Sequence, residues 1–135
     1  MLEASTQINW LAVALASVAC VVLGGVYFGA LVSRQYLVVL GRTEAPQPDL
    51  VGAVGPLVCM IVTVLTSAVL VAALGLSSAG DAIGFGLVVG VGYLVAMTFQ
   101  IAINPNFPHP LRYGLLNAPF FVTTSLVTSL ALVLV

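Results

Sequence analysis

Four long apolar runs constrain this chain more than any other feature of its sequence. They cover residues 9–32, 53–76, 82–103 and 114–135. At a rise of about 1.5 Å per residue, each run can cross a hydrocarbon layer of about 30 Å as an α-helix. The sequence therefore predicts an all-α fold, an integral membrane four-helix bundle that runs up-down-up-down, in a single transmembrane domain over residues 1–135.

The composition indicates that lipid, not water, is the main solvent. Hydrophobic residues make up 61% of the 135 positions and charged residues 5%, against about 25% charged residues in an average soluble domain. A net charge of −1 with no basic cluster argues against nucleic acid as a partner, because phosphate binding depends on several lysine or arginine contacts. The charged side chains all fall near breaks between the apolar runs: Glu3, Arg34, Arg42, Glu44, Asp49, Asp81 and Arg112.

The first apolar run is expected to remain in the protein as a membrane helix. No basic residue precedes it, and it is longer than the roughly 7 to 15 residues of a signal-peptide core. Cys20 and Cys59 lie inside the first and second runs, where a thiol usually serves as a small apolar group. Their spacing gives no disulfide framework, so we expect no disulfide.

The arginines predict how the chain sits in the membrane. Arg34 and Arg42 lie in the connection 33–52 and Arg112 in the connection 104–113, which share one side of a four-pass chain. The positive-inside rule assigns that side to the cytoplasm. We therefore expect a multi-pass protein of a bacterial inner membrane with both termini on the outer side, and with Trp10 and Tyr36 as interfacial anchors.

The first two connections carry local signals. The segment "YLVVL" (36–40) predicts a short element that lies in the membrane interface. The stretch "LSSAGDAIG" (76–84) is short, and Ser77 or Ser78, together with Asp81, is available to cap the helix that follows. The second and third helices are therefore expected to form an antiparallel hairpin.

The last connection, "NPNFPHPLRYG" (104–114), gathers three prolines and the only histidine. Asn104 and Pro105 are expected to end the third helix. Pro108 and Pro110 should keep the link extended, because proline fixes φ and lacks an N–H. Arg112 should hold the start of the fourth helix at the level of the lipid headgroups.

Small residues predict where helices touch. Lipid tails are as apolar as leucine, so helices in a bilayer associate through close packing of small side chains and a few polar contacts. Two uses stay open for these glycines, which are packing within the chain and contact with another subunit. The pairs spaced four residues apart are Gly25 with Gly29, Gly80 with Gly84, and Gly86 with Gly90.

A few polar side chains lie within or beside the runs. Gln100 and Asn117 could hydrogen-bond to each other or contact a substrate, and Asn104 is a further polar contact at the end of the third run. The hydroxyl groups of the last run, represented by Thr124, have two readings. They line a polar path, or they return to a carbonyl one turn earlier in the same helix.

The sequence offers little for catalysis. Metal binding needs several ligands at workable spacing, and nucleophilic catalysis needs a nucleophile with a base and an orienting group. His109 has no companion that would make it a base or a ligand, so a structural or solvated role at the cytoplasmic interface is expected, beside Arg34, Arg42 and Arg112. We expect no enzyme, no catalytic residue, no cofactor and no metal.

Both ends of the chain resemble the small four-helix bacterial membrane proteins of the domain of unknown function 1761 family. The opening matches an Asn-Trp start followed by a Leu-Gly-x-x-aromatic-aromatic-Gly exit, carried by Asn9, Trp10, Leu23, Gly24, Tyr27, Phe28 and Gly29. The tail resembles the family's ending, where an acid and an arginine stand in the turn before the last helix. Here that turn reads Asn106, Phe107, Pro108 and His109. The resemblance implies the four-helix architecture and no activity.

These observations favour a non-catalytic membrane protein that acts by packing. We expect an accessory or stabilising subunit of a larger inner-membrane assembly, with a transport complex as a natural host. The alternative is a homo-oligomer that passes a small molecule or lipid between subunits as a transporter or channel. The expected partners are the lipid bilayer and either other membrane subunits or further copies of this chain.

Overall fold

A computed structural model describes residues 8–45, 47 and 49–135. Glu3, one of the charged residues above, lies outside these residues. The described part of the chain is helical and contains no strand. Its elements are α1 (Trp10–Val26), the π-helical segment η2 (Tyr27–Leu31), α2 (Ser33–Val39), α3 (Leu50–Leu74), α4 (Ala79–Leu87), the π-helical segment η3 (Val88–Val95), α5 (Ala96–Ala102) and α6 (Pro110–Leu134).

Four continuous helices are long and apolar enough to cross a membrane. They are Trp10–Leu31, Leu50–Leu74, Ala79–Ala102 and Pro110–Leu134. The predicted all-α, four-helix architecture is confirmed, and the short element expected at "YLVVL" is α2. Large apolar side chains cover the outside of the bundle, as lipid contact requires.

Three helices begin earlier than the apolar runs indicated, among them α4, which begins at Ala79. α3 begins at Leu50 because the Asp49 carboxylate, at Oδ1, accepts the Gly52 N–H at 2.7 Å and caps the helix. α6 begins at Pro110, so the prediction that this proline extends the link is wrong. Proline fits the first position of a helix, where its fixed φ is helical and its missing N–H has no partner to lose. Arg112 therefore lies in the first turn of α6.

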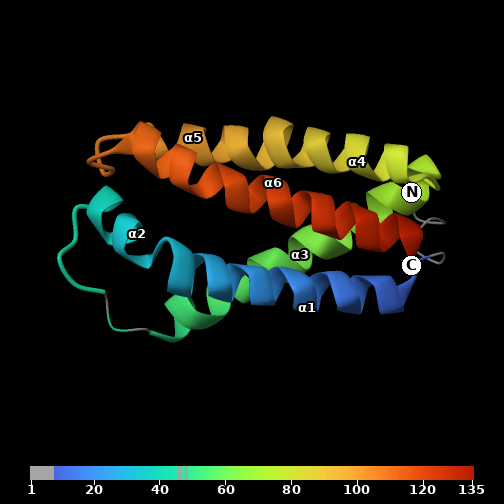
Figure 1. The fold of residues 1–135 in the computed structure, drawn as a ribbon, viewed down its shortest axis with the longest axis horizontal. Helices are drawn as coiled ribbons and strands as arrows, with labels where there is room; N and C mark the ends of the chain where they lie inside the picture. Colours follow the sequence, from blue (N-terminus) through green and yellow to red (C-terminus); the bar gives the residue numbers. More distant parts are fainter. Residues whose placement is uncertain (1–7, 46, 48) are drawn as a thin grey trace.

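α6 lies at the centre of the bundle (Figure 1). It packs against the third span (α4, η3 and α5) on one side, and against α1 and α3 on the other. α3 crosses behind α1 and α6, and among the described residues it makes no extended contact with the third span. The expected hairpin of the second and third helices is therefore antiparallel but not a packed pair.

The turn between α3 and α4 follows the predicted capping. The Ser78 hydroxyl accepts the Asp81 N–H at 3.1 Å, while the Asp81 carboxylate accepts the Ser78 N–H at 3.2 Å. This reciprocal pair is a capping box, which satisfies two backbone donors at the start of the helix. Gly75, with φ of 64°, ends α3 in the left-handed conformation that glycine adopts without strain.

The apolar core lies where α1, α3 and α6 meet. Its buried centre consists of Val13, Ala16, Cys20, Val64 and Ala68. Cys20 is buried there, whereas Cys59 is exposed on α3, and both thiols are free. Most members are small, so the helix axes can approach closely, which is the main source of helix association in lipid.

The two long connections lie at one end of the bundle, and the turn before α4 lies at the other with the start of α1 and the end of α6 (Figure 1). The three arginines therefore share one end, as the sequence predicted. We call this the arginine end. Which face of the membrane it meets stays a prediction.

Candidate functional site

Two of the predicted packing glycines let the third span touch the backbone of α6. A Cβ added at Gly86 would lie 2.5 Å from Ser129 Oγ and 3.0 Å from the Leu126 Cα, and one added at Gly90 would lie 3.1 Å from the Ser125 Cβ. Across this contact the Ser125 hydroxyl donates to the Gly86 carbonyl at 2.9 Å. Gly86 and Gly90 therefore serve packing within the chain.

Of the other predicted packing glycines, a Cβ added at Gly80 would contact only Ser78, and the remaining three face open space. A Cβ added at Gly25, Gly29 or Gly84 would meet no atom within 4 Å. Gly25 and Gly29 are exposed at the end of α1 and in η2, beside Val22 and Val26, which are 58% and 51% exposed. We call Gly25 and Gly29, with these two valines, the open glycine face. It is available to lipid or to a partner helix.

The buried hydroxyl groups of α6 are engaged within the protein. Thr124 Oγ1 donates to the Phe120 carbonyl at 2.9 Å, one turn earlier in the same helix. Thr128 Oγ1 lies 3.3 Å from Cys20 Sγ on α1. Every fully buried side-chain nitrogen or oxygen in the described part of the chain has a hydrogen-bond partner. This arrangement fits the interpretation that the hydroxyls return to carbonyls and pack helices.

The three amide side chains are not brought together. Asn117 is buried, and its amide nitrogen donates to the Tyr113 carbonyl at 2.8 Å. Gln100 is exposed on α5, so the expected hydrogen bond between Gln100 and Asn117 does not form. Asn104 accepts the Asn106 N–H at 2.8 Å and donates to the Ile101 carbonyl, which closes the end of the third span. Asn104 and Asn117 therefore act in local structure.

Aromatic rings tie the arginine end together. The hydroxyl oxygens of Tyr36 on α2 and Tyr113 on α6 lie 3.3 Å apart. The Phe107 ring, in the connection before α6, lies 4.7 Å from the Tyr113 ring, and the Phe28 ring lies 5.3 Å from the Tyr36 ring. Such pairs stabilise by about 0.5–1.5 kcal/mol beyond the area they bury. They hold α2 and the last connection against the start of α6.

The Tyr36 phenol is kept neutral by its surroundings. Burial raises the pKa of the Tyr36 phenol, and the hydrogen bond and charge of Tyr113 raise it further, whereas the charge of Arg42 lowers it. The Tyr36 phenol therefore stays protonated at neutral pH. His109 and the three arginines are exposed at this end.

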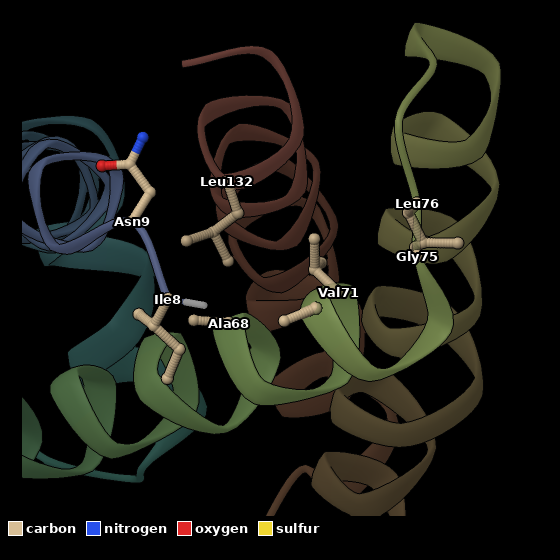
Figure 2. Close-up of a pocket in the computed structure, with 8 residues that line it drawn as sticks. Ile8, Asn9, Ala68, Val71, Gly75, Leu76 and Leu132 are labelled. Atoms are coloured by element: carbon tan, nitrogen blue, oxygen red, sulfur yellow. The ribbon is translucent and has the colours of Figure 1, made fainter. Parts of the chain in front are cut away.

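A cavity of about 280 Å³ opens at the opposite end of the bundle (Figure 2). Its walls come from the start of α1, the end of α3 and the end of α6, and include Ile8, Ala68, Val71 and Leu132. The polar wall residue Asn9 is used locally, because its side-chain oxygen accepts the N–H groups of Leu11 and Ala12. The lining supplies no acid, base or nucleophile. Within the described ranges no three or more His, Cys, Asp or Glu residues cluster as a metal site.

Several contacts had no signal strong enough to predict them. Tyr27 donates its hydroxyl to the Leu116 carbonyl at 2.7 Å, across 89 positions of sequence. Cys20 and Thr128 meet in the core, although each looks unremarkable in its own run. Helical periodicity alone could not place Gly25 and Gly29 outside and Gly86 and Gly90 inside, because both pairs have the same spacing and only Gly29 and Gly90 lie in the π-helical segments η2 and η3.

The two classes of glycine predict opposite responses to the same substitution. Gly86→Leu should lower the free energy of unfolding by about 1–3 kcal/mol or more, because the side chain has no space beside α6. Gly84→Leu, two positions away on the same helix, should leave the free energy unchanged or raise it slightly, since leucine favours helix. Unfolding in mixed micelles by titration with SDS measures the free energy of unfolding of both variants. An equal loss of this free energy in the two variants would contradict the placement of these glycines.

Comparison with known proteins gives a family and no assigned activity. Residues 11–133 match the family described as "Protein of unknown function (DUF1761)". No curated protein and no solved structure matches the chain. The match covers all four spans, from the first turn of α1 to the last turn of α6. The chain therefore belongs to the DUF1761 family of proteins of unknown function.

Proposed function

We propose that this protein is a non-catalytic subunit that acts by helix packing, as an accessory or stabilising component of a larger membrane assembly. The open glycine face is the observation that carries the proposal. It is exposed on the first span, where no described residue covers Gly25 or Gly29. A bacterial inner-membrane complex, such as one for transport, is the proposed host.

Glycine in a helix is less favourable than alanine by about 1 kcal/mol, and against lipid its missing side chain gives no compensating contact. Against another helix the same position allows close approach of two backbones. Gly86 and Gly90 show that use inside this protein, where α6 covers them. The open glycine face has the same four-residue spacing and is free for a partner.

A homo-oligomer that passes a small molecule or lipid is the alternative, and the open glycine face would serve it equally well. The polar side chains of α6 weigh against a path through the chain itself. Thr124, Ser125 and Asn117 are buried and hydrogen-bonded within the protein. The accessory role requires none of these groups to be free, which favours it over transport.

The open glycine face predicts a loss of assembly without a loss of fold. Gly25→Leu with Gly29→Leu should release the protein from its complex, because two leucines hold a partner helix away, while the free energy of unfolding stays within about 0.5 kcal/mol. Gly84→Leu is the control, because it makes the same substitution at a glycine of the third span whose added Cβ would meet no atom within 4 Å.

The measurement is the mass of the tagged protein purified from its own host in mild detergent. A complex with other proteins that persists in the control and falls apart in the double variant is expected. A wild-type mass equal to that of one chain would contradict the proposal that the protein belongs to an assembly. A wild-type mass of several copies and nothing else supports the homo-oligomer instead.

The proposed orientation puts the arginine end in the cytoplasm. Thr43 lies exposed in the connection after α2, between Arg42 and Glu44. With Cys20 and Cys59 replaced by alanine, Thr43→Cys should react with a membrane-impermeant maleimide only after the cells are opened. Ser77→Cys, in the turn at the other end, is the matched control and should react in intact cells. Labelling of Thr43→Cys in intact cells, and of Ser77→Cys only in opened cells, would show the opposite orientation.

A further inference from the structure

The arginine end contains an open pocket at the start of α6. Its lining residues are Pro108, His109, Pro110, Leu111 and Arg112, around a volume of about 290 Å³. The turn after α2 contacts one of these residues. A Cβ added at Gly41 would lie 3.1 Å from Pro108 Cγ, so this turn rests directly on the pocket wall.

The turn after α2 is fixed by its backbone. Gly41 has a φ of 67°, and its N–H donates to the Val38 carbonyl at 3.0 Å. The N–H of Arg42 donates to the Leu37 carbonyl at 2.9 Å, which completes a helix-ending motif that needs a left-handed residue at Gly41. Arg42 therefore follows directly after the residue that touches Pro108, and its backbone is held there.

A second set of contacts, through two tyrosines, brings Arg42 and Arg112 to one surface. The charge of Arg42 acts on the Tyr36 phenol, whose hydroxyl lies 3.3 Å from that of Tyr113. Tyr113 is the neighbour of Arg112 in the first turn of α6. The aromatic contacts of Phe107 and Tyr36 with Tyr113 keep this arrangement rigid. Both arginines are exposed, so a ligand can reach their guanidinium groups.

The charge of this end favours an anion. All three arginines of the chain lie here, with two acids, Glu44 and Asp49. The Asp49 carboxylate is committed to the start of α3, where it accepts the Gly52 N–H at 2.7 Å. At the other end the described charged residue is Asp81. The arginine end therefore carries three positive and two negative charges, and Arg is the side chain that binds phosphate oxygens in pairs.

The apolar surface next to the pocket identifies the source of the phosphate. Leu111 lies in the pocket wall and is 62% exposed, and Leu115, one turn further into the membrane on α6, is 65% exposed. A lipid with its headgroup in the pocket would lay an acyl chain along these leucines. We propose that Arg42 and Arg112 bind the phosphate of an anionic phospholipid at this pocket, with His109 and Pro108 as its walls.

The purified full-length chain in detergent tests this proposal with phosphatidylglycerol as the probe and phosphatidylcholine as the zwitterionic comparison. Native mass spectrometry counts bound lipid. One arginine near a membrane surface contributes about 1 kcal/mol to binding an anionic lipid. Arg42→Gln and Arg112→Gln should therefore each lower the affinity for phosphatidylglycerol about fivefold, and the double variant should lower it roughly thirtyfold.

Arg34→Gln is the matched control, because it removes the same charge from the first turn of α2. It should retain phosphatidylglycerol as the wild type does. An equal loss in all three single variants would show general surface attraction and overturn the site. So would a wild type that binds both lipids alike, a result that needs no variant to fold.

Competition with glycerol 3-phosphate distinguishes a lipid ligand from a soluble phosphate ligand. It carries the same phosphate without acyl chains, so it should not displace phosphatidylglycerol at equal concentration. Displacement at equal concentration would mean that a soluble phosphate compound is the ligand and would overturn the lipid assignment. This binding is independent of the packing role proposed above, since Gly25→Leu with Gly29→Leu should leave it unchanged.

Discussion

The contact on which this structure depends is the one between the backbones of the third span and α6. At Gly86 and Gly90 no side chain separates the two helices, and the Ser125 hydroxyl bridges them at the Gly86 carbonyl. In lipid there is no gain from hiding apolar surface, so this approach supplies the dispersion contacts and the polar link that hold the third span. α1 and α3 then pack on the other side of α6 through small side chains.

A central α6 explains why its polar residues carry no free chemistry. A buried hydroxyl or amide without a partner is unfavourable in a membrane interior. Asn117, Thr124 and Ser125 bond to carbonyls of α6 or of a neighbouring helix, and Thr128 pairs with the Cys20 thiol. The surfaces left for function are therefore outside. They are the open glycine face on the first span and the arginine end, where rigid aromatic contacts position exposed charges.

Much of the fold could be predicted because length and hydropathy decide whether a segment spans a membrane. The four spans, the capping box at Ser78 and the shared end of the arginines all follow from local sequence. The packing partners of each span do not follow from local sequence. Gly25 with Gly29 and Gly86 with Gly90 have identical spacing, and only the arrangement around α6 places one pair outside and the other inside. Pro110 shows the same limit on a small scale, since proline both starts helices and extends loops.

A double-mutant cycle at Gly86 and Ser129 tests the central contact most directly. A Cβ at Gly86 would lie 2.5 Å from Ser129 Oγ, and Ser129→Ala removes that oxygen. Gly86→Ala alone should lower the free energy of unfolding by about 1–3 kcal/mol, and adding Ser129→Ala should restore at least about 0.5 kcal/mol of it. Effects that add within about 0.3 kcal/mol would mean that the two residues do not touch, and would contradict the central position of α6.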